Sequence, residues 1–408
     1  MNMACHGRWR NWRHHWLFRM ETKAGDPGAF AHFDLARVPS PAFVVDEAAI
    51  RRNLEVLADV KERSGAKILL ALKAFSMWSL AHLIDQYLDG CCASGLWETK
   101  LADEHFNSFI STYSPAYKAA DLKEISALSD HVIFNNPAQI GRWKSQNDQT
   151  INLTGCDIGL RLNPEIALGE TPKYDPSQLH SRLGFPISQL QPSHFDAISG
   201  IHFHNLCEQN FDALEQTWNK IEPTIAPYFD RLDWINLGGG HHIVRDDYDR
   251  DALVRFLNDL KTRTGCEIYL EPGEAVVLDA GILVGEILDV FNNGMPIGIT
   301  DISATCHMPD VIEAPYRPSL LGEQSEGGLI RLGGPSCLAG DIIGDYRLSE
   351  PAHIGQRIAF LDQAHYSMVK TNTFNGVPLP AIWLWNSETD DLQCITRFDW
   401  TAFRDRLG

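Results

Sequence analysis

Positive charge is scarce in this sequence, and paired cysteine motifs and long apolar runs are absent from it. Lys and Arg total 35 against 53 Asp and Glu, which gives a formal net charge of -18. Such a field repels nucleic-acid phosphates and anionic membrane surfaces, so we expect neither as a partner. It favours a cationic substrate, although an acidic surface also serves solubility alone. No apolar stretch approaches the length of a transmembrane helix.

The nine cysteines form no recognisable framework. Cys91 and Cys92 are adjacent, the others are scattered, and no C-x-x-C pair occurs. The chain also has no secretory leader with a continuous apolar core. An odd cysteine count without a framework predicts reduced thiols and a cytoplasmic protein.

The first residues differ from everything that follows. Within residues 1–19 arginines alternate with tryptophans, and no acid precedes Glu21. A basic aromatic segment fits a targeting leader or a membrane-surface contact. We favour a start assigned too early, with translation beginning at Met20. We therefore expect residues 1–38 to be a leader outside the fold, disordered or wrongly assigned.

Strand-like and helix-like patterns alternate regularly from about residue 46 to residue 275. Repeated βα units indicate a parallel sheet, and this number of units favours a closed (β/α)8 TIM-type barrel. We assign residues 39–275 to the barrel domain, with the extended stretch 39–45 pairing with a second domain. The expected barrel strands are Ile68–Leu72, Gly90–Ala93, Ser108–Tyr113, His131–Asn135, Ile158–Leu162, Gly200–His204, Trp234–Leu237 and Cys266–Leu270.

Residues 276–408 have a different texture, with short strand-like runs broken by Gly, Pro and Asn and little helical spacing. This pattern predicts a mostly antiparallel β domain after the barrel, so the fold class is α/β. The expected strands are Val276–Val277, Gly281–Val290, Pro296–Thr300, Gly328–Leu332, Arg357–Leu361 and Ala381–Trp385.

The apolar run Ile68–Leu72 ends at Lys73, and the chain turns immediately afterwards. A lysine at the C-terminal end of a buried parallel strand lies where α/β proteins build active sites. A dry environment lowers the pKa of an ammonium group, which a Schiff-base lysine requires. The alternative from this stretch alone is a lysine that merely reaches solvent from a strand end.

Two histidines follow another predicted strand. His202 and His204 are two residues apart and therefore face the same way on an extended chain. Such a pair can hold a divalent metal, as in metal-dependent hydrolases, or one ring can stack on an aromatic cofactor. A structural role for one of them is equally compatible with the pattern.

Two further motifs end neighbouring strands. Gly238, Gly239 and Gly240 follow Trp234–Leu237, and backbone without Cβ atoms can bring N–H groups close to a phosphate. Glu271 ends the next strand, where a buried carboxylate could stabilise a protonated pyridine nitrogen. Either motif alone also fits a plain βα turn or a capping glutamate.

The β domain carries the last candidate residues. Cys337 lies on the glycine turn Gly333-Gly334-Pro335-Ser336-Cys337, with Asp341 four residues further on. Tyr366 lies in the run Gln363–Met368 and could donate a hydrogen bond to a phosphate. A buried inert cysteine and a loop tyrosine are the alternatives.

In this order, the motifs resemble the fold-type III, alanine racemase-like pyridoxal phosphate decarboxylases, over about residues 39–385. His202–Gln209, Trp234–Ile243, Thr305–Pro318 and Tyr366–Gly376 are most similar to carboxynorspermidine/carboxyspermidine decarboxylases. The resemblance implies decarboxylation of a small cationic carboxylated polyamine. It also implies a homodimer with shared active sites, no metal and no nucleic-acid partner.

The resemblance assigns roles to individual residues. Lys73 carries the pyridoxal 5'-phosphate and displaces the product, His204 stacks on the ring, and Glu271 pairs with the pyridine nitrogen. Phosphate binding falls to Gly238, Gly239, Gly240 and Tyr366. Cys337 reaches the site of the neighbouring subunit, and Cys337 or Lys73 returns the proton to the carbon that loses CO₂.

Two positions depart from the pattern. Glu274 stands where ornithine decarboxylases have a phosphate-binding arginine, so phosphate affinity should rest more on backbone donors. Leu338 stands where relatives have an acid for the distal amine of the substrate, and Asp341 is its expected substitute. We further expect Asp310 and Glu313 to offset the distal charge and Arg317 to meet a carboxylate.

Three alternatives remain from the sequence. Diaminopimelate decarboxylase, or a decarboxylase of another basic amino acid, shares the fold, but the second carboxylate of diaminopimelate would need a cationic partner. A metal-dependent hydrolase would use His202 and His204. A catalytically inactive pyridoxal-binding regulator would keep the cofactor without turnover.

Overall fold

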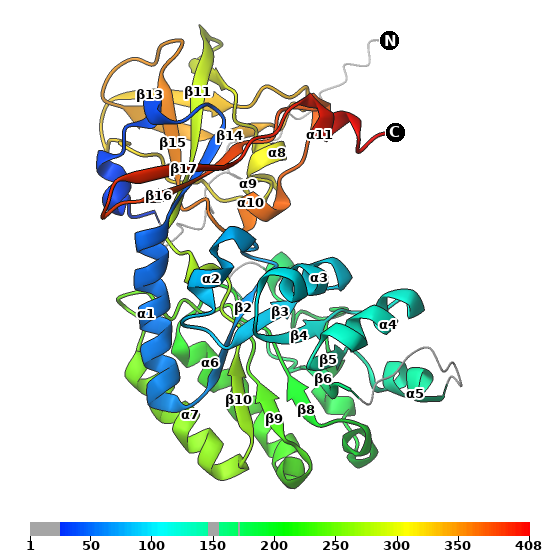
Figure 1. Cartoon of the computed structure of the whole chain (residues 1–408). Helices are drawn as coiled ribbons and strands as arrows, with labels where there is room; N and C mark the ends of the chain where they lie inside the picture. Colours follow the sequence, from blue (N-terminus) through cyan, green and yellow to red (C-terminus); the bar gives the residue numbers. More distant parts are fainter. Residues whose placement is uncertain (1–24, 146–154, 170–171) are drawn as a thin grey trace, which may run out of the picture.

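The computed structural model describes residues 25–145, 155–169 and 172–408, which form a barrel and a β domain (Figure 1). The expectation for residues 1–24 lies outside the described residues. Eight parallel strands close into a ring in the order β2, β3, β4, β5, β6, β8, β9 and β10. Their bounds are β2 Lys67–Ala71, β3 Gly90–Ala93, β4 Phe109–Tyr113, β5 His131–Phe134, β6 Asp157–Asn163, β8 Gly200–His202, β9 Trp234–Asn236 and β10 Glu267–Leu270.

Helices cover the outside of the barrel and begin and end at recognisable signals. In α1, the Asp46 side chain accepts a hydrogen bond from the backbone of Ala48, and the helix ends at Gly65 in the left-handed conformation. Ile50, Leu54 and Leu57 recur on one buried face of this helix. The helices are α1 Glu47–Ser64, α2 Ala81–Ile84, α3 Leu96–His105, α4 Ala119–Leu128, α5 Pro137–Ser145, α6 Phe211–Ile225 and α7 Arg250–Thr264; the short strand β7 (Phe185–Pro186) pairs with β6.

Aromatic rings fill the interior of the barrel below its mouth. Trp234 stacks on His131, with ring centroids 4.0 Å apart. Gly159 and Gly200 leave the space for this indole, because a Cβ atom would lie 2.4 Å and 2.0 Å from it. The barrel is therefore a packed core with its open end at the C-terminal ends of the strands.

The β domain is built on one long strand, β11, which pairs with β1 and β15 in its first half and with β12 in its second. The sheet order is β14-β13-β12-β11-β1-β16-β17, with β15 also on β11. The strands are β1 Ala42–Asp46, β11 Gly281–Asn292, β12 Pro296–Thr300, β13 Gly328–Gly333, β14 Ile342–Leu348, β15 Arg357–Leu361, β16 Ala381–Asn386 and β17 Asp391–Thr396; the helices are α8 Ala304–His307, α9 Asp310–Glu313, α10 Tyr366–Lys370 and α11 Trp400–Arg404. The fold class is confirmed as a TIM-type barrel with an antiparallel-rich β domain.

The N-terminal part of the described chain belongs to the β domain. Strand β1 pairs with β11 and β16, so the extended stretch before α1 lies in the second sheet. Phe30 and Phe33 pack on Trp385 of that sheet, with ring centroids 5.3 Å and 4.9 Å away. The expectation of a leader outside the fold is thus wrong for residues 25–38, because their aromatic residues complete a core cluster.

Differences at the domain boundary are small. Val276–Val277, expected as a strand, lies at the end of the short 3-10 helix Glu274–Val276.

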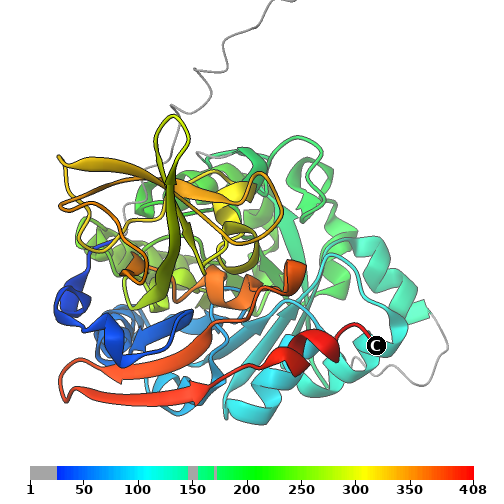
Figure 2. The same cartoon turned by 90° about the horizontal axis from the view of Figure 1, so that it is seen from above.

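Seen from above, the β domain lies over the barrel (Figure 2). The C-terminal ends of the barrel strands therefore face the second domain, which sets the position of the site.

Candidate active site

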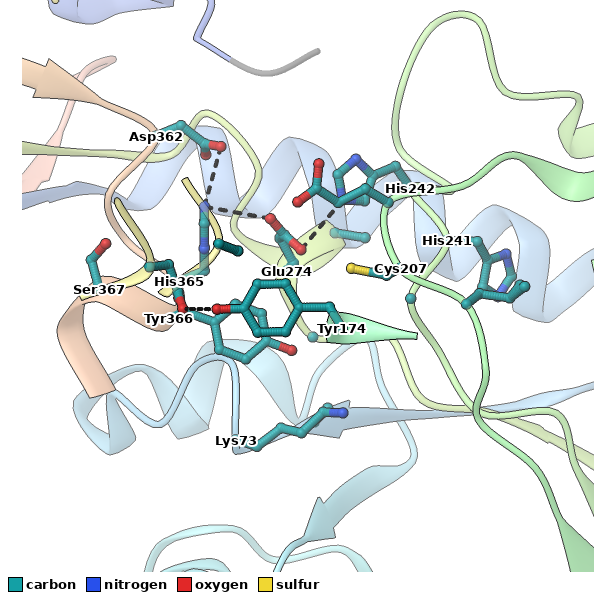
Figure 3. Close-up of a pocket in the computed structure, with 18 of the residues that line it drawn as sticks. Lys73, Tyr174, Cys207, His241, His242, Glu274, Asp362, His365, Tyr366 and Ser367 are labelled. Atoms are coloured by element: carbon teal, nitrogen blue, oxygen red, sulfur yellow. Dashed lines mark hydrogen bonds and ion pairs between the residues drawn. The ribbon is translucent and has the colours of Figure 1, made fainter. Parts of the chain in front are cut away.

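A cavity of about 370 Å³ lies between the barrel and the β domain. The barrel contributes residues at its strand ends, and the β domain contributes α9, α10 and the loop after β15 (Figure 3). Most of the candidate functional residues in the cavity wall are charged or polar. They are Lys73, Arg161, His204, Cys207, Glu208, Gly240, His242, Glu271, Glu274, Asp310, Asp362, His365 and Tyr366.

Neighbouring strands place the central residues side by side. The register pairs Arg161 of β6 with His202 of β8, and His202 with Asn236 of β9. Glu271 follows β10, and Lys73 follows β2, which closes the ring next to β10. Because parallel strands end at one edge, five consecutive strands deliver their polar residues to one side of the barrel mouth.

Glu271 is a buried carboxylate held by two donors. His202 Nε2 lies 3.2 Å from Oε2, and Asn236 Nδ2 donates to Oε1 at 2.7 Å. Burial alone would raise the pKa of Glu271, but His202 and Asn236 lower it to about 2. Asn236 is itself fixed, since its Oδ1 accepts the N–H of Gly238 at 2.9 Å. The site therefore holds a preorganised negative charge.

Lys73 is held as a neutral amine. Its Nζ lies 3.0 Å from His204 Nε2, while the Gly239 N–H donates to His204 Nδ1 at 2.9 Å. Burial lowers the pKa of His204, so the ring is neutral, and because Nδ1 accepts from Gly239 its one proton lies on Nε2. Nε2–H then donates to Lys73, which can accept only as the free amine. Burial, followed by the charge of Arg161, correspondingly lowers the pKa of Lys73.

The three glycines are required by close backbone approach. A Cβ atom on Gly239 would lie 1.9 Å from the carbonyl oxygen of Glu271, and one on Gly240 would lie 2.0 Å from that of Leu206. Gly238 and Gly240 also have positive φ angles, of 70° and 86°. The amides of Gly238 and Gly239 are already bonded to Asn236 and His204. Of the three, only Gly240 lines the cavity, so the expectation that all three amides face a phosphate needs correction.

A cluster of acids and histidines occupies the far end of the cavity from Lys73 (Figure 3). Glu274 pairs with His242 at 3.5 Å and with His365 at 3.6 Å, and His365 Nε2 also lies 3.2 Å from Asp362. Sequence reasoning singled out Glu274 only as a departure and missed its partners. Their signal was weak, because His242 follows the glycine loop and His365 precedes Tyr366 without forming a motif.

Tyr366 and Asp310 lie in the cavity wall. Burial raises the pKa of Tyr366 far above its ordinary value, so its hydroxyl remains a hydrogen-bond donor. Asp310 accepts from Tyr174 at 2.7 Å and from Lys370. Lys370 also pairs with Glu313 at 3.2 Å, and Glu313 itself does not line the cavity.

Three other predicted residues lie outside the cavity of their own chain. Arg317 is held by both carboxylate oxygens of Glu323 at 2.9 Å, so it is not available for a substrate carboxylate. Asp341 is buried and accepts from Ser303, Thr305 and Ser336, which corrects its expected contact with the substrate amine. Cys337 is exposed on the β domain.

The histidine pair also tests the metal alternative. Ligand atoms of His202, His204 and Glu271 lie within 4.8 Å of one another. Both nitrogens of His204 are engaged by Gly239 and Lys73, however, and His202 Nε2 is engaged by Glu271. A metal would have to displace these bonds, so the geometry favours a lysine-centred site.

The barrel capped by a β domain has the diaminopimelate decarboxylase fold, and Lys73 and Glu271 lie at the cavity that the two domains share. A solved diaminopimelate decarboxylase supports the fold, with a TM-score of 0.76 at 19% identity, over 91% of this chain and 94% of that chain. No family model matches the chain.

Closer relatives identify the family. The chain is 38% identical to carboxynorspermidine/carboxyspermidine decarboxylase of Campylobacter jejuni, over 90% of this chain and 98% of that protein. It is 36% identical to carboxyaminopropylagmatine decarboxylase of Synechocystis, over 92% and 97%. A crystal structure of carboxynorspermidine decarboxylase from Campylobacter jejuni, complexed with norspermidine, has a TM-score of 0.82 at 37% identity, over 90% of this chain and 100% of that chain.

The chain belongs to the carboxynorspermidine/carboxyspermidine decarboxylase family. The resemblance predicted from the ordered motifs is thereby confirmed, and the protein is a decarboxylase. None of the relatives named above supports the alternative of a metal-dependent hydrolase.

Proposed function

We propose that this protein removes one carboxylate as CO₂ from carboxynorspermidine or carboxyspermidine, in polyamine biosynthesis, with pyridoxal 5'-phosphate as its cofactor. The observation that carries the proposal is that the Lys73 amine, bonded to His204, and the buried carboxylate of Glu271, bonded to Asn236, face the same cavity. The names of two relatives at 36% and 38% identity support the substrate.

The residues present fit this cofactor. Lys73 offers an unprotonated nucleophile, which covalent attachment to an aldehyde requires. Gly240 forms part of a wall where any Cβ atom would collide with backbone, and buried nitrogens of His242 and His365 have no hydrogen-bond partner among the described residues. When bound, pyridoxal phosphate supplies an electron sink for the pair released by CO₂ loss.

Each protein group has a task in this chemistry. Glu271, as a fixed anion, would keep a nearby pyridine nitrogen protonated. His204, held by Gly239, would offer a neutral ring for stacking. Lys73 takes and returns protons at its Nζ and releases the product. Gly238 and Gly239 act through position, since their amides fix Asn236 and His204.

The charges in the cavity favour a polycation over diaminopimelate. Glu208, Glu274, Asp310 and Asp362 line the cavity. Lys370 and the two arginines there already have partners: Lys370 pairs with Asp310 and Glu313, Arg245 pairs with Asp247, and Arg161 donates to the carbonyl oxygen of His204. A second substrate carboxylate would therefore have to compete with these partners.

We further propose a homodimer in which Cys337 of each chain enters the neighbouring active site. Cys337 is exposed, its amide donates to Asn375 at 2.9 Å, and Asp341 holds the turn that presents it. Cys337 would then supply a proton in the partner's site. Mixing Lys73→Ala and Cys337→Ala dimers should restore roughly a quarter of wild-type activity, because random exchange makes half the dimers mixed, each with one intact site.

The expectations that the protein has no membrane partner and lies in the cytoplasm remain proposals. Among the described residues, no helix combines the length and the apolarity needed to cross a membrane. All eight described cysteines are free thiols, which supports a reducing compartment such as the cytoplasm.

A CO₂-release assay tests the proposed function. The purified protein is supplied with pyridoxal phosphate and, separately, carboxynorspermidine, carboxyspermidine, carboxyaminopropylagmatine, diaminopimelate and ornithine. We expect turnover with the first two. Exclusive turnover of diaminopimelate or ornithine would replace the substrate assignment, while cofactor uptake without any turnover would indicate the inactive regulator.

A further inference from the structure

His242 and His365 lie on opposite sides of the Glu274 carboxylate (Figure 3). His365 is additionally paired with Asp362, at 3.2 Å. Burial alone would lower the pKa of His365, but Asp362 and Glu274 raise it to about 10. Burial also opposes the charge of His242, and Glu274 outweighs it and raises that pKa. The two carboxylates thus favour the charged imidazolium form of both rings.

An imidazolium ion carries an N–H on each ring nitrogen, and these donors are incompletely used. His365 Nε2 faces the two carboxylates, but its buried Nδ1 has no acceptor among the described residues. His242 makes no hydrogen bond through either nitrogen to a described residue, and Glu274 engages it through an ion pair at 3.5 Å. A buried charged donor without an acceptor is costly, so these rings are suited to a bound anion.

The surrounding backbone points to the same kind of ligand. Gly240, two residues before His242, lines the cavity, and its N–H has no acceptor in the described part of the chain. Tyr366, next to His365, offers a hydroxyl that stays protonated. Two imidazolium ions, a free amide and a phenol form a donor set for the oxygens of a phosphate monoester.

We propose that His242 and His365 bind the phosphate group of the cofactor, and that Glu274 is the counterion that keeps both rings charged. This inference rests on the proposed function, because it assumes that pyridoxal phosphate occupies the cavity. It gives the negatively charged Glu274 an indirect role in binding an anion. The carboxylate acts on the phosphate through the histidines and is a positioning residue.

The other charged groups of the cluster are compatible with this role. Glu208 faces both histidines, and burial and the charge of Glu274 raise its pKa to about 7. A phosphate nearby would keep Glu208 protonated, so it would add little repulsion. Asp362 pairs with His365 and accepts a hydrogen bond from the backbone N–H of Asp279.

The test compares two ligands that differ only in the phosphate. Dissociation constants for pyridoxal phosphate and for pyridoxal are measured by absorbance titration of the full chain freed of cofactor. We expect His242→Gln and His365→Gln to weaken pyridoxal phosphate binding about 10- to 100-fold, the loss typical of a hydrogen bond to a charged group. Binding of pyridoxal should stay unchanged, since it lacks the phosphate.

His241→Gln is the matched control on the same loop. The Nδ1 atom of His241 lies 2.6 Å from the Tyr248 hydroxyl, and burial lowers the pKa of His241 to about 3, so this ring is neutral. Its replacement should lower the melting temperature without changing the preference for the phosphorylated ligand. Equal losses for both ligands in the His242 and His365 variants would overturn the inference, because general damage to the site acts that way.

The pH dependence supplies a second measurement. Glu274→Gln removes the shared counterion and lowers the pKa of both histidines. As pH rises, both rings should therefore lose their charge at a lower pH in this variant than in the wild type. The affinity for pyridoxal phosphate should then begin to fall at lower pH in this variant than in the wild type. A pH profile identical to the wild type would contradict the role of Glu274. If the wild-type protein took up no pyridoxal phosphate at all, the proposed function itself would fail, which is a separate outcome.

Discussion

Replacing Glu271 with glutamine should remove the charge of the site while preserving its hydrogen-bonded frame. Asn236 is fixed by Gly238, so its Nδ2 must keep donating to residue 271, through the glutamine oxygen. The new NH₂ group then faces His202 Nε2, which must lose its proton. His202 Nδ1 is buried without a partner and can take that proton. We expect the variant to fold.

The size of the expected stability loss follows from the lowered pKa of the Glu271 carboxylate. A pKa lowered from 4.5 to about 2 corresponds to about 3 kcal/mol of stability at neutral pH. Neutral hydrogen bonds, worth about 1 kcal/mol each, replace part of this in the glutamine variant. We therefore expect a net loss of about 1 to 2 kcal/mol, or a few degrees in melting temperature for a chain of this size.

The sign of the pH dependence is fixed by the lowered pKa. The wild-type carboxylate contributes its full stability above pH 4.5 and loses it as pH falls through about 2. The difference in melting temperature between wild type and Glu271→Gln should consequently narrow over that range. Turnover should fall about a hundredfold or more, since the ring nitrogen loses its anionic partner. A variant with wild-type turnover, or a stability difference that widens in acid, would refute this reasoning.

Three other substitutions test separate parts of the structure. Lys73→Arg should abolish turnover and the absorbance band of the lysine-bound cofactor as fully as Lys73→Ala, because a guanidinium cannot act as a neutral amine; either signal surviving would remove Lys73 from the chemistry. Asp341→Ala leaves the hydroxyl groups of Ser303 and Ser336 without their acceptor and should lower the free energy of unfolding by about 1 to 3 kcal/mol. An unchanged free energy of unfolding would show that these contacts do not stabilise the fold. Gly200→Ala forces a Cβ atom to 2.0 Å from Trp234 and should cost about 1 to 3 kcal/mol. Trp234→Phe in the same chain should recover part of that loss, and its failure to do so would argue against this contact.

The barrel could be predicted from the sequence because each of its strands is a local apolar run followed by a turn. The predicted strand Gly200–His204 ends at His202 in the structure, yet His204 still faces the site that its motif suggested. Two strands of the β domain escaped notice. Ile342–Leu348 is interrupted by Gly344 and Asp345, and Asp391–Thr396 is a half-buried edge strand without an apolar run.

Side-chain partnerships were beyond the reach of the sequence. Arg317 and Asp341 looked available to a substrate, but Glu323 and a set of hydroxyl groups engage them. The cluster around Glu274 forms only when the β15 loop folds over the barrel mouth, so no local pattern could reveal it. Phe30 and Phe33 were likewise read as part of a leader, because their contact with the β domain is a tertiary one.

The most direct test of the central claim is mass spectrometry of the products from carboxynorspermidine and carboxyspermidine, with pyridoxal phosphate present and Lys73→Ala as the control. The account predicts norspermidine and spermidine, each lighter than its substrate by one CO₂, with the wild-type protein alone. Unchanged substrates with the wild-type protein, or the same products from the Lys73→Ala variant, would contradict it.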